Sequence, residues 1–386
     1  MSNENQQDIN PLPEEWVNEY LSNSGISYDY KTDGYRQGSQ VIEPKILMAK
    51  LRLQANKDGL QGFRPLLVDS LMLWRYEQQF SVLQGYRNQL EGHHDPDDIS
   101  NWVKAATGDN SPLDIAVVKH FVWQVKRKLF GLPVDHHIMP ILFGKSGGGK
   151  SVAIHKLVEP LKELTLETNM SVFQDRFGMR QFSRNYIMFF DELSGASNVD
   201  VNRLKQVITA PVMEWRVMHS EGVNSAPQNC TFIGCTNTHV SERIKDPTSA
   251  RRFWQLTCAD KLDWENINSI DYSSLWRSVD HYCQSPILHH LAEIKEVQER
   301  EIRAKSLTEQ WLEQCCKPTD FNSSSPTSKT LYQNFQQWAQ WQKLQQNYTF
   351  QQFSKELPQS IATLGIPIKS KHSNRGTIWS VELQSE

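Results

Sequence analysis

The strongest chemical signal in this 386-residue chain is the run ILFGKSGGGKS, an apolar segment followed by a glycine-rich turn. Gly144, four residues, then Gly149, Lys150 and Ser151 satisfy the GxxxxGK(S/T) spacing of a phosphate-binding loop. Backbone N–H groups of such a turn, together with the start of the helix that follows it, bind phosphate oxygens. The spacing therefore predicts a site for a nucleoside triphosphate.

Different side chains of this loop are expected to bind the phosphates and the metal ion. Lys150 is expected to reach the β- and γ-phosphates of ATP, and the Ser151 hydroxyl is expected to bind Mg²⁺. The residues expected to contact the nucleotide are Gly144, Lys145, Ser146, Gly147, Gly148, Gly149, Lys150, Ser151 and Val152. A chance glycine-rich turn is the alternative, and the apolar strand before the turn and the helical pattern after it count against that reading.

A second apolar segment, YIMFF at residues 186–190, ends in Asp191 and Glu192. Carboxylates at the end of a buried strand beside a phosphate-binding loop are suited to metal binding and to proton transfer. We therefore expect Asp191 on the Mg²⁺ side and Glu192 activating the attacking water. A strand that simply ends in a charged turn is the alternative, and the neighbouring loop makes it the weaker one.

A third predicted strand, residues 231–235, leads to Asn237, whose amide is expected to bridge the γ-phosphate and the water. An asparagine after a strand is also a common turn former, which is the alternative.

The paired arginines lie in the next motif, DPTSARRFW, where Arg251 and Arg252 precede two aromatic residues. One of these guanidinium groups is expected to act on the nucleotide of a neighbouring subunit, although a surface salt bridge is the usual fate of an arginine. The sequence does not decide between the two arginines.

Between the acidic strand and Asn237, the sequence predicts a β-hairpin. Residues 213–218 and 230–234 have the pattern of strands, and residues 219–227 have the composition of a polar turn. Arg216 and His219 near its tip, with Lys205 on the preceding helix, are expected to contact a DNA backbone. An ordinary surface hairpin is the alternative, and the residues alone favour it; the expectation of a DNA contact depends on the resemblance described below.

The pattern of apolar residues around these motifs predicts an α/β fold, with a mostly parallel sheet covered by helices. The expected divisions are a partly ordered leader at 1–40, a helical N-terminal domain at 41–130, the P-loop ATPase core at 131–260, a helical subdomain at 261–316, a linker at 317–328 and a winged-helix-like DNA-binding domain at 329–386. In this last segment, Lys369, Lys371 and Arg375 lie in the expected wing and are candidates for phosphate contacts. A solvated loop is the equal alternative there.

Composition sets limits on partners and cofactors. The net charge of −3 means that the surface as a whole does not attract a polyanion, so a local basic stripe or a ring interior would have to bind nucleic acid. The six cysteines lack the spacing of a zinc site, so we expect free thiols. There is no apolar run of the ~20 residues that span a membrane and no pattern of a secretory signal. We therefore expect a cytoplasmic protein with no membrane partner.

The order of the motifs resembles that of the superfamily 3 helicases of viruses, phages and mobile elements, and among these the virulence-associated protein E family. The resemblance spans roughly residues 60–260 and is carried by the phosphate-binding loop, Asp191 with Glu192, Lys205 with Arg216, residues 234–237, and the Arg-Arg-Phe-Trp run at 251–254. The chain departs from the usual pattern before the paired arginines, where Thr-Ser-Ala stands at 248–250 in place of a glycine-containing stretch.

This resemblance implies a hexameric ring of the AAA+ class that moves on single-stranded or forked DNA and hydrolyses ATP with Mg²⁺, in replication of a phage, satellite or other mobile element. Only about 130 residues precede the core, without a zinc motif or paired catalytic carboxylates, so a primase or polymerase would be a separate chain. Two alternatives stay open. One is an ATP-switched origin-binding initiator that does not unwind DNA, and the other is a defence or regulatory ATPase.

Overall fold

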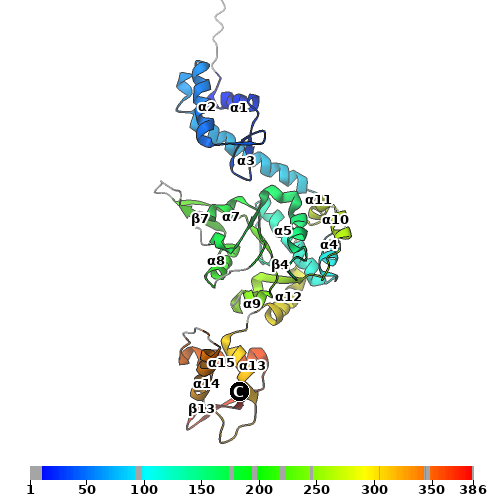
Figure 1. Ribbon diagram of the computed structural model, residues 1–386, viewed down its shortest axis with the longest axis vertical. Helices are drawn as coiled ribbons and strands as arrows, with labels where there is room; N and C mark the ends of the chain where they lie inside the picture. Colours follow the sequence, from blue (N-terminus) through cyan, green and yellow to red (C-terminus); the bar gives the residue numbers. More distant parts are fainter. Residues whose placement is uncertain are drawn as a thin grey trace, which may run out of the picture.

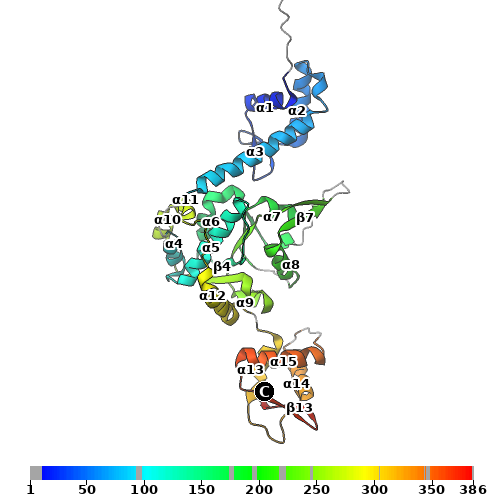
Figure 2. The same cartoon turned by 180° about the vertical axis from the view of Figure 1, so that it is seen from behind.

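The computed structural model describes residues 11–92, 98–173, 178–193, 198–216, 223–243, 247–303, 305–342, 344 and 348–384. These residues form three hydrophobic clusters, which belong to an N-terminal unit, a central domain and a C-terminal unit. Along the longest axis of the molecule the three follow one another in chain order (Figures 1 and 2).

The central domain is built on a five-stranded sheet in which every neighbouring pair is parallel. Its strands, in spatial order, are β10 (Phe253–Thr257), β4 (Met139–Phe143), β9 (Thr231–Thr236), β6 (Ile187–Phe190) and β5 (Thr165–Thr168). The three middle strands are almost entirely buried, which is why their sequences are continuous apolar runs and do not alternate. The predicted α/β fold is confirmed.

Helices surround this sheet, and most of them contribute side chains to the largest hydrophobic cluster. They are α4 (Asp98–Thr107), α5 (Pro112–Leu129), α6 (Lys150–Val158), η2 (Glu159–Leu164), η3 (Met170–Phe173), η4 (Gly178–Arg180), α7 (Gln181–Arg184), α8 (Asn198–Thr209), α9 (Val240–Arg243), η5 (Pro247–Arg252), α10 (Trp264–Ser269), α11 (Tyr272–Arg277), η6 (Leu288–His290), α12 (Leu291–Val297) and η7 (Gln298–Ile302). The start of α5 shows how sequence fixes these ends. The Ser111 hydroxyl accepts a hydrogen bond from the Asp114 backbone N–H, and Pro112 occupies the first turn.

The N-terminal unit contains a small sheet as well as helices. Its elements are α1 (Pro13–Asn23), β1 (Ile26–Asp29), β2 (Gly34–Gln37), β3 (Gln40–Ile42), α2 (Pro44–Lys57), η1 (Gln61–Phe63) and the first half of α3 (Leu67–Leu90). Trp16, Val17 and Leu21 of α1 are buried in one core with Leu47 of α2 and Leu71 of α3. The expected boundary at residue 40 therefore falls inside one packed unit.

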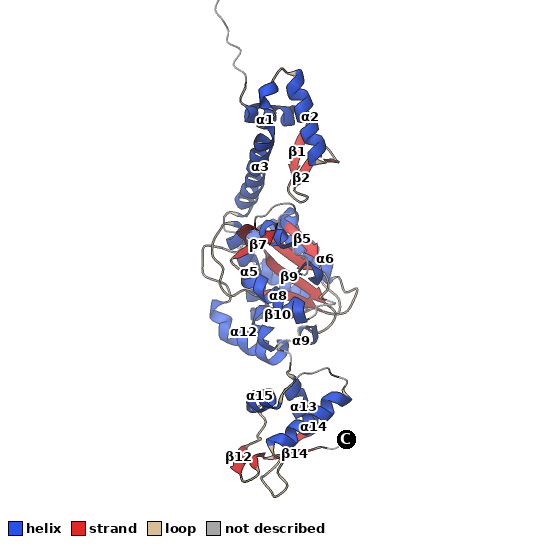
Figure 3. Ribbon diagram, turned by 90° about the vertical axis from the view of Figure 1, so that its left-hand side faces the viewer, coloured by secondary structure: helices blue, strands red, loops and turns tan. Residues whose placement is uncertain are grey.

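Helix α3 joins this unit to the central domain. It has 24 residues, so it is about 36 Å long, and Figure 3 shows it running from one body to the other. Leu71 and Trp74 belong to the N-terminal core, whereas Leu90 belongs to the central one. Helices α4 and α5 also pack in the central core. The helical stretch expected at 41–130 is thus shared between two bodies.

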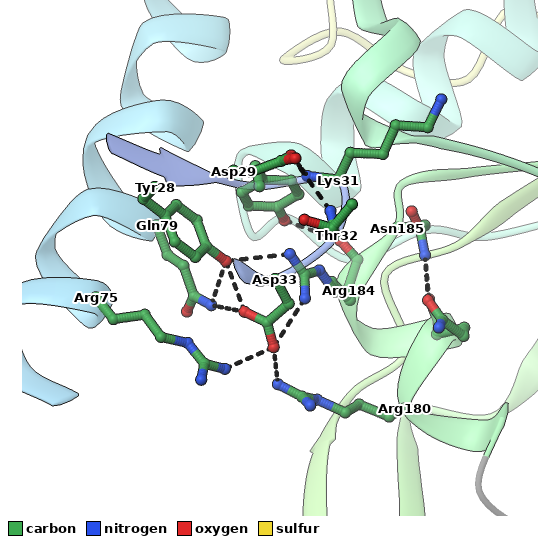
Figure 4. Close-up of polar contacts among 12 residues, drawn as sticks. Tyr28, Asp29, Lys31, Thr32, Asp33, Arg75, Gln79, Arg180, Arg184 and Asn185 are labelled. Carbon is green, nitrogen blue, oxygen red and sulfur yellow. Dashed lines mark hydrogen bonds and ion pairs between the residues drawn. The ribbon is translucent and has the colours of Figure 1, made fainter. Parts of the chain in front are cut away.

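A turn between β1 and β2 fixes the N-terminal unit to the central domain (Figure 4). Tyr30 in this turn is buried in the central core, and its hydroxyl donates a hydrogen bond to the Arg184 carbonyl at 2.9 Å. Asp33 has a left-handed φ of 58° and is the acceptor of a dense polar cluster. The groups that donate to its carboxylate are Arg75 Nη2 (2.5 Å), Arg184 Nη1 (2.9 Å), Arg180 Nη2, Gln79 Nε2 (3.1 Å) and the Tyr28 hydroxyl (2.7 Å).

The C-terminal unit has its own aromatic core, with Trp311, Phe335 and Phe353 packed edge to face or tilted. Its elements are α13 (Leu307–Cys315), β11 (Cys316–Pro318), α14 (Ser328–Trp341), α15 (Phe350–Leu364), β12 (Ser370–Ser373), β13 (Gly376–Trp379) and β14 (Val381–Leu383). Because β11 pairs with β14, the first residues of the expected linker at 317–328 belong to this unit. The same is true of α13, which was expected in the helical subdomain. No helix among the described residues is both long and apolar enough to cross a bilayer.

Candidate nucleotide-binding site

The glycine-rich loop connects β4 to α6 at the carboxyl end of the sheet. Gly147 and Gly149 have φ of 75° and 88°, a region that residues with a Cβ atom rarely adopt. Gly149 is also crowded, because a Cβ atom there would lie 2.3 Å from Cζ2 of Trp264. Helix α6 begins at Lys150, so its N-terminal backbone N–H groups lie beside the loop.

A pocket of about 280 Å³ lies beside this loop. The Lys150 side chain is almost buried, and its ammonium donates to the Gly144 and Lys145 carbonyls at 2.9 and 2.7 Å. Asn237, after β9, faces the same pocket. The other residues of its lining are Phe143, Gly144, Lys145, Gly148, Thr257, Cys258, Ala259, Asp260 and Leu262. Three neighbouring strands therefore deliver polar groups to one place.

Ser151 and Asp191 meet at this end of the sheet, although 40 residues separate them in the chain. The Ser151 hydroxyl donates a hydrogen bond to Asp191 Oδ1. Hard oxygen donors of this kind suit Mg²⁺ better than a softer metal. The donor pair therefore fits the ion that the loop sequence implies. No cluster of three or more acidic, histidine or cysteine ligands occurs in the part of the chain that the structure describes.

Glu192 directly follows Asp191 and is exposed. It makes no hydrogen bond or ion pair with another described residue, so its carboxylate is available to solvent. Val152, on the first turn of α6, is also exposed, with 51% of its surface accessible. Lys145 is held by an exposed ion pair with Asp260 at 2.7 Å, which places the two at the mouth of the pocket.

Beyond the pocket lining, Cys235 and Trp264 also contact the residues of this site, and neither was predicted. Cys235 lies under the Ser151–Asp191 pair, with its Sγ atom 2.6 Å from the Asp191 carbonyl and 3.6 Å from Ser151 Oγ. Burial raises the pKa of its thiol to about 12, so it remains protonated and packs as a small polar side chain. Trp264 covers Gly149 from α10, outside the expected core segment. Neither residue type has a sequence signature for such a role.

The paired arginines lie at the other end of the sheet. Strand β10 pairs with β4 so that Phe253 is beside Met139, and Thr257 is beside Phe143 just before the glycine loop. Arg251 and Arg252 precede Phe253, so they are separated from the loop by the whole strand, about 13 Å for four residue steps.

These arginines line a second pocket, of about 550 Å³. The Arg251 side chain is exposed and Arg252 is half-buried. Burial and the neighbouring Arg251 lower the pKa of Arg252, and burial followed by the charges of both arginines lowers the pKa of Lys205 on α8. The remaining residues of the lining are His136, His137, Ile138, Thr209, Leu291, Ile294, Lys295, Gln298 and Glu299. Basic groups therefore gather at this end.

The predicted hairpin exists, but with a different second strand. Strand β7 (Val212–Arg216) pairs with β8 (Val223–Pro227), whereas the segment expected to be its partner is the buried β9 of the main sheet. Strand β8 is mostly exposed, so it lacks the apolar residues by which a strand is detected. The hairpin projects from the central domain (Figures 1 and 2). Arg216 ends β7 with its side chain outside the described part, and His219 lies outside the described residues.

The three basic residues expected in the wing are exposed along the β12–β13 hairpin. Lys371 places its ammonium 4.3 Å from the centroid of the Phe321 ring, and Arg375 donates to the Ser323 carbonyl at 3.1 Å. The Lys369 backbone N–H donates to Ser380 Oγ at 2.7 Å. The contacts of Lys371 and Arg375 hold the hairpin against the segment before α14, while all three basic residues remain exposed.

The sheet is parallel, and a GxxxxGK(S/T) loop follows one of its buried strands. An amide and an acidic side chain follow the next two strands of the sheet. This is the architecture of a P-loop α/β domain. The chain belongs to the virulence-associated protein E-like domain family, whose domain matches residues 88–308. This membership confirms the resemblance found in the sequence, and it supports a protein of phage or mobile-element replication.

Two solved structures, both described as the apo A form of the NrS-1 C-terminal region, are similar to the chain. One is 12% identical with a TM-score of 0.42 and covers 77% of this chain and 78% of that chain. The other is 13% identical with a TM-score of 0.47 and covers 76% and 77%. At this level of similarity they carry no information on what the chain binds. No curated protein matches the chain.

Proposed function

We propose that this chain is a ring-forming, ATP-hydrolysing DNA helicase of superfamily 3 that acts in replication of a phage, satellite or other mobile element. The observation that carries the proposal is the convergence of Lys150, Ser151, Asp191 and Asn237 at one end of the sheet. These groups come from three neighbouring strands, and each has the chemistry that phosphoryl transfer needs.

In this proposal the loop amides and Lys150 would bind the phosphates of ATP, while Ser151 and Asp191 would hold Mg²⁺. The metal would neutralise charge on the β- and γ-phosphate oxygens. Glu192, exposed at the end of β6, would orient the water and accept its proton, and Asn237 would hydrogen-bond the γ-phosphate and that water.

The distance between the two ends of the sheet supports a ring. Arg251 and Arg252 are too far along β10 to reach the nucleotide bound beside their own loop. They can act only on a nucleotide held by a neighbouring copy, where a guanidinium would stabilise the charge of the transition state. A cyclic arrangement gives every copy one such neighbour.

DNA contacts in this proposal come from the projecting β7–β8 hairpin with Arg216 and His219, and from Lys205 on α8. The hairpin begins a few residues after α8, which itself starts beyond Glu192, so hydrolysis and hairpin position are linked through one short stretch of chain. The C-terminal unit, proposed as a winged helix, would add Lys369, Lys371 and Arg375 as phosphate contacts.

The test is hydrolysis of MgATP and displacement of a labelled strand from forked DNA by the full-length chain, beside Lys150→Ala and a control, Lys162→Ala. Lys162 is exposed in η2 and is not part of the pocket lining. We expect Lys150→Ala to lower both activities at least ~100-fold, because the lysine stabilises charge that develops on the phosphates, and Lys162→Ala to leave them intact. Hydrolysis without unwinding would favour a regulatory ATPase, and DNA binding without either activity would favour an initiator.

A further inference from the structure

The outer face of α3 is apolar although it lies away from the core of the N-terminal unit. Leu67, Leu71 and Trp74 are buried on one side of the helix. On the opposite side, large apolar side chains recur at spacings of three, four and seven residues and are 47–68% exposed; they are Leu66, Val68, Met72, Leu73, Tyr76 and Phe80. A helix that is apolar on both faces is normally buried on both. Isolated exposed apolar residues are ordinary, but a continuous stripe of six marks a contact surface.

A second exposed face with apolar residues lies on α2. Ile46, Lys50, Leu53 and Lys57 follow one another at spacings of four, three and four residues, so they share one side of the helix. Ile46 and Leu53 are 52% and 63% exposed. Lys45 and Arg52 are the other charged residues of α2, which has no acidic residue. Apolar and basic side chains therefore alternate along this face, and Lys45 and Arg52 add further positive charge to the helix.

The charges around the α3 stripe have the opposite sign. Asp69 and Glu77 are exposed beside it, while Arg75 of the same segment is already paired with Asp33. Among the described residues, neither acid has an ion-pair partner, and neither do the four basic residues of α2. The two faces are thus complementary in charge, and each has apolar side chains to bury.

We propose that the N-terminal unit is a self-association surface, in which the α2 face of one copy binds the α3 stripe of a second copy of this chain. A contact between two different faces is heterologous, so in a pair one copy keeps its α3 stripe free and the other keeps its α2 face free, and further copies can add until a ring closes. The proposed helicase ring supplies the setting, but this contact needs neither nucleotide nor hydrolysis. It can therefore fail while the ATPase stands, and the reverse also holds.

The test is sedimentation of the full-length chain without nucleotide over a range of concentrations. We expect concentration-dependent assembly, and at least ~10-fold weaker assembly when Met72→Glu and Phe80→Glu are combined, since two charges then enter an apolar contact. The matched control is Trp341→Glu, which changes a side chain 71% exposed on the C-terminal unit and should keep wild-type assembly. All substituted residues are exposed, so far-ultraviolet circular dichroism should stay unchanged.

A pair of charge reversals identifies the partner as a second copy. Lys50→Glu with Lys57→Glu on α2, or Asp69→Lys with Glu77→Lys on α3, should each weaken assembly because like charges then face each other. All four together restore the opposite signs and should recover most of the lost affinity. A wild-type chain that remains monomeric at every concentration overturns the proposal. The proposal is also overturned if the variant with Met72→Glu and Phe80→Glu forms assemblies of the same mass as the wild type. The same holds if the fourfold variant assembles no better than either reversal alone.

Discussion

The two ends of the central sheet differ in how their charged groups are satisfied. At the loop end, Lys150 donates to two carbonyls and Ser151 donates to Asp191. At the other end, arginines, histidines and lysines gather around a pocket in which Glu299 is the only acidic residue of the described lining. One end is internally balanced and the other has an excess of positive charge. This difference is what the proposed function requires, because there the basic end acts on the nucleotide of a neighbouring copy.

The largest effect should come from a mutation that removes the arginine end and leaves the loop end intact. We expect Arg251→Ala to lower ATP hydrolysis ~1000-fold, the scale of an arginine that acts across an interface. Arg251 is chosen because its side chain is exposed, whereas Arg252 is half-buried. A mixture of Arg251→Ala with Lys150→Ala should regain activity, because about a quarter of randomly assembled interfaces then have an intact lysine and an intact arginine.

Arg252→Ala, mixed in the same way, is the matched comparison and should give a smaller loss. If the Arg251→Ala mixture is no more active than its two components, the arginine end does not act on a neighbour. Activity is read as phosphate release at a fixed total concentration of protein.

A smaller effect should follow from Gly149→Ala at the loop end. The new methyl group would meet Trp264 at 2.3 Å, in a backbone conformation with φ of 88°. Left-handed strain and overpacking together should lower the free energy of unfolding by about 2–4 kcal/mol, with weaker binding of a fluorescent ATP analogue. Gly85→Ala, on the exposed side of α3 with no atom within 4 Å, is the control and should be neutral or slightly stabilising. Equal effects of the two changes would show that the loop is not crowded.

The smallest effect concerns pH at the arginine end. His120 is fully buried, where it donates through Nε2 to the His136 carbonyl at 2.7 Å and accepts from Ser285 at Nδ1. Burial lowers its pKa to about 3, so the unfolded chain binds the proton first as the pH falls below about 6.5. The stability due to neutral His120 is therefore complete above pH 6.5 and is lost progressively toward pH 3.

At pH 5 this loss amounts to about 2 kcal/mol for the single group. Urea unfolding at pH 7 and pH 5 measures it: His120→Gln should be less stable at pH 7 but should lose about 2 kcal/mol less on acidification than the wild type does. His155→Gln, at a half-exposed position on α6, should keep the wild-type difference. The same difference in His120→Gln and wild type would contradict the expectation.

The sequence predicted the sheet and the convergence of its loops because both follow from local signals. A strand that ends in a glycine turn or in Asp191 can be recognised from its local sequence, and parallel strands bring such ends together. Cys235 and Trp264 were missed because their positions depend on tertiary packing. Strand β8 was missed because an exposed strand needs no apolar residues. The small sheet β1–β3 was read as a leader for the same reason, since each of its three strands has only one buried side chain.

The Asp33 cluster connects the N-terminal unit to the segment of the central domain that leads into β6. Three guanidinium groups from two bodies meet on one carboxylate, and two of them come from η4 and α7, which lead directly into β6. Because β6 ends at Asp191 and Glu192, a torque on the N-terminal unit would be delivered to the strand that carries both acids. Movement of the N-terminal unit and the hydrolysis proposed at the end of β6 would then be mechanically connected.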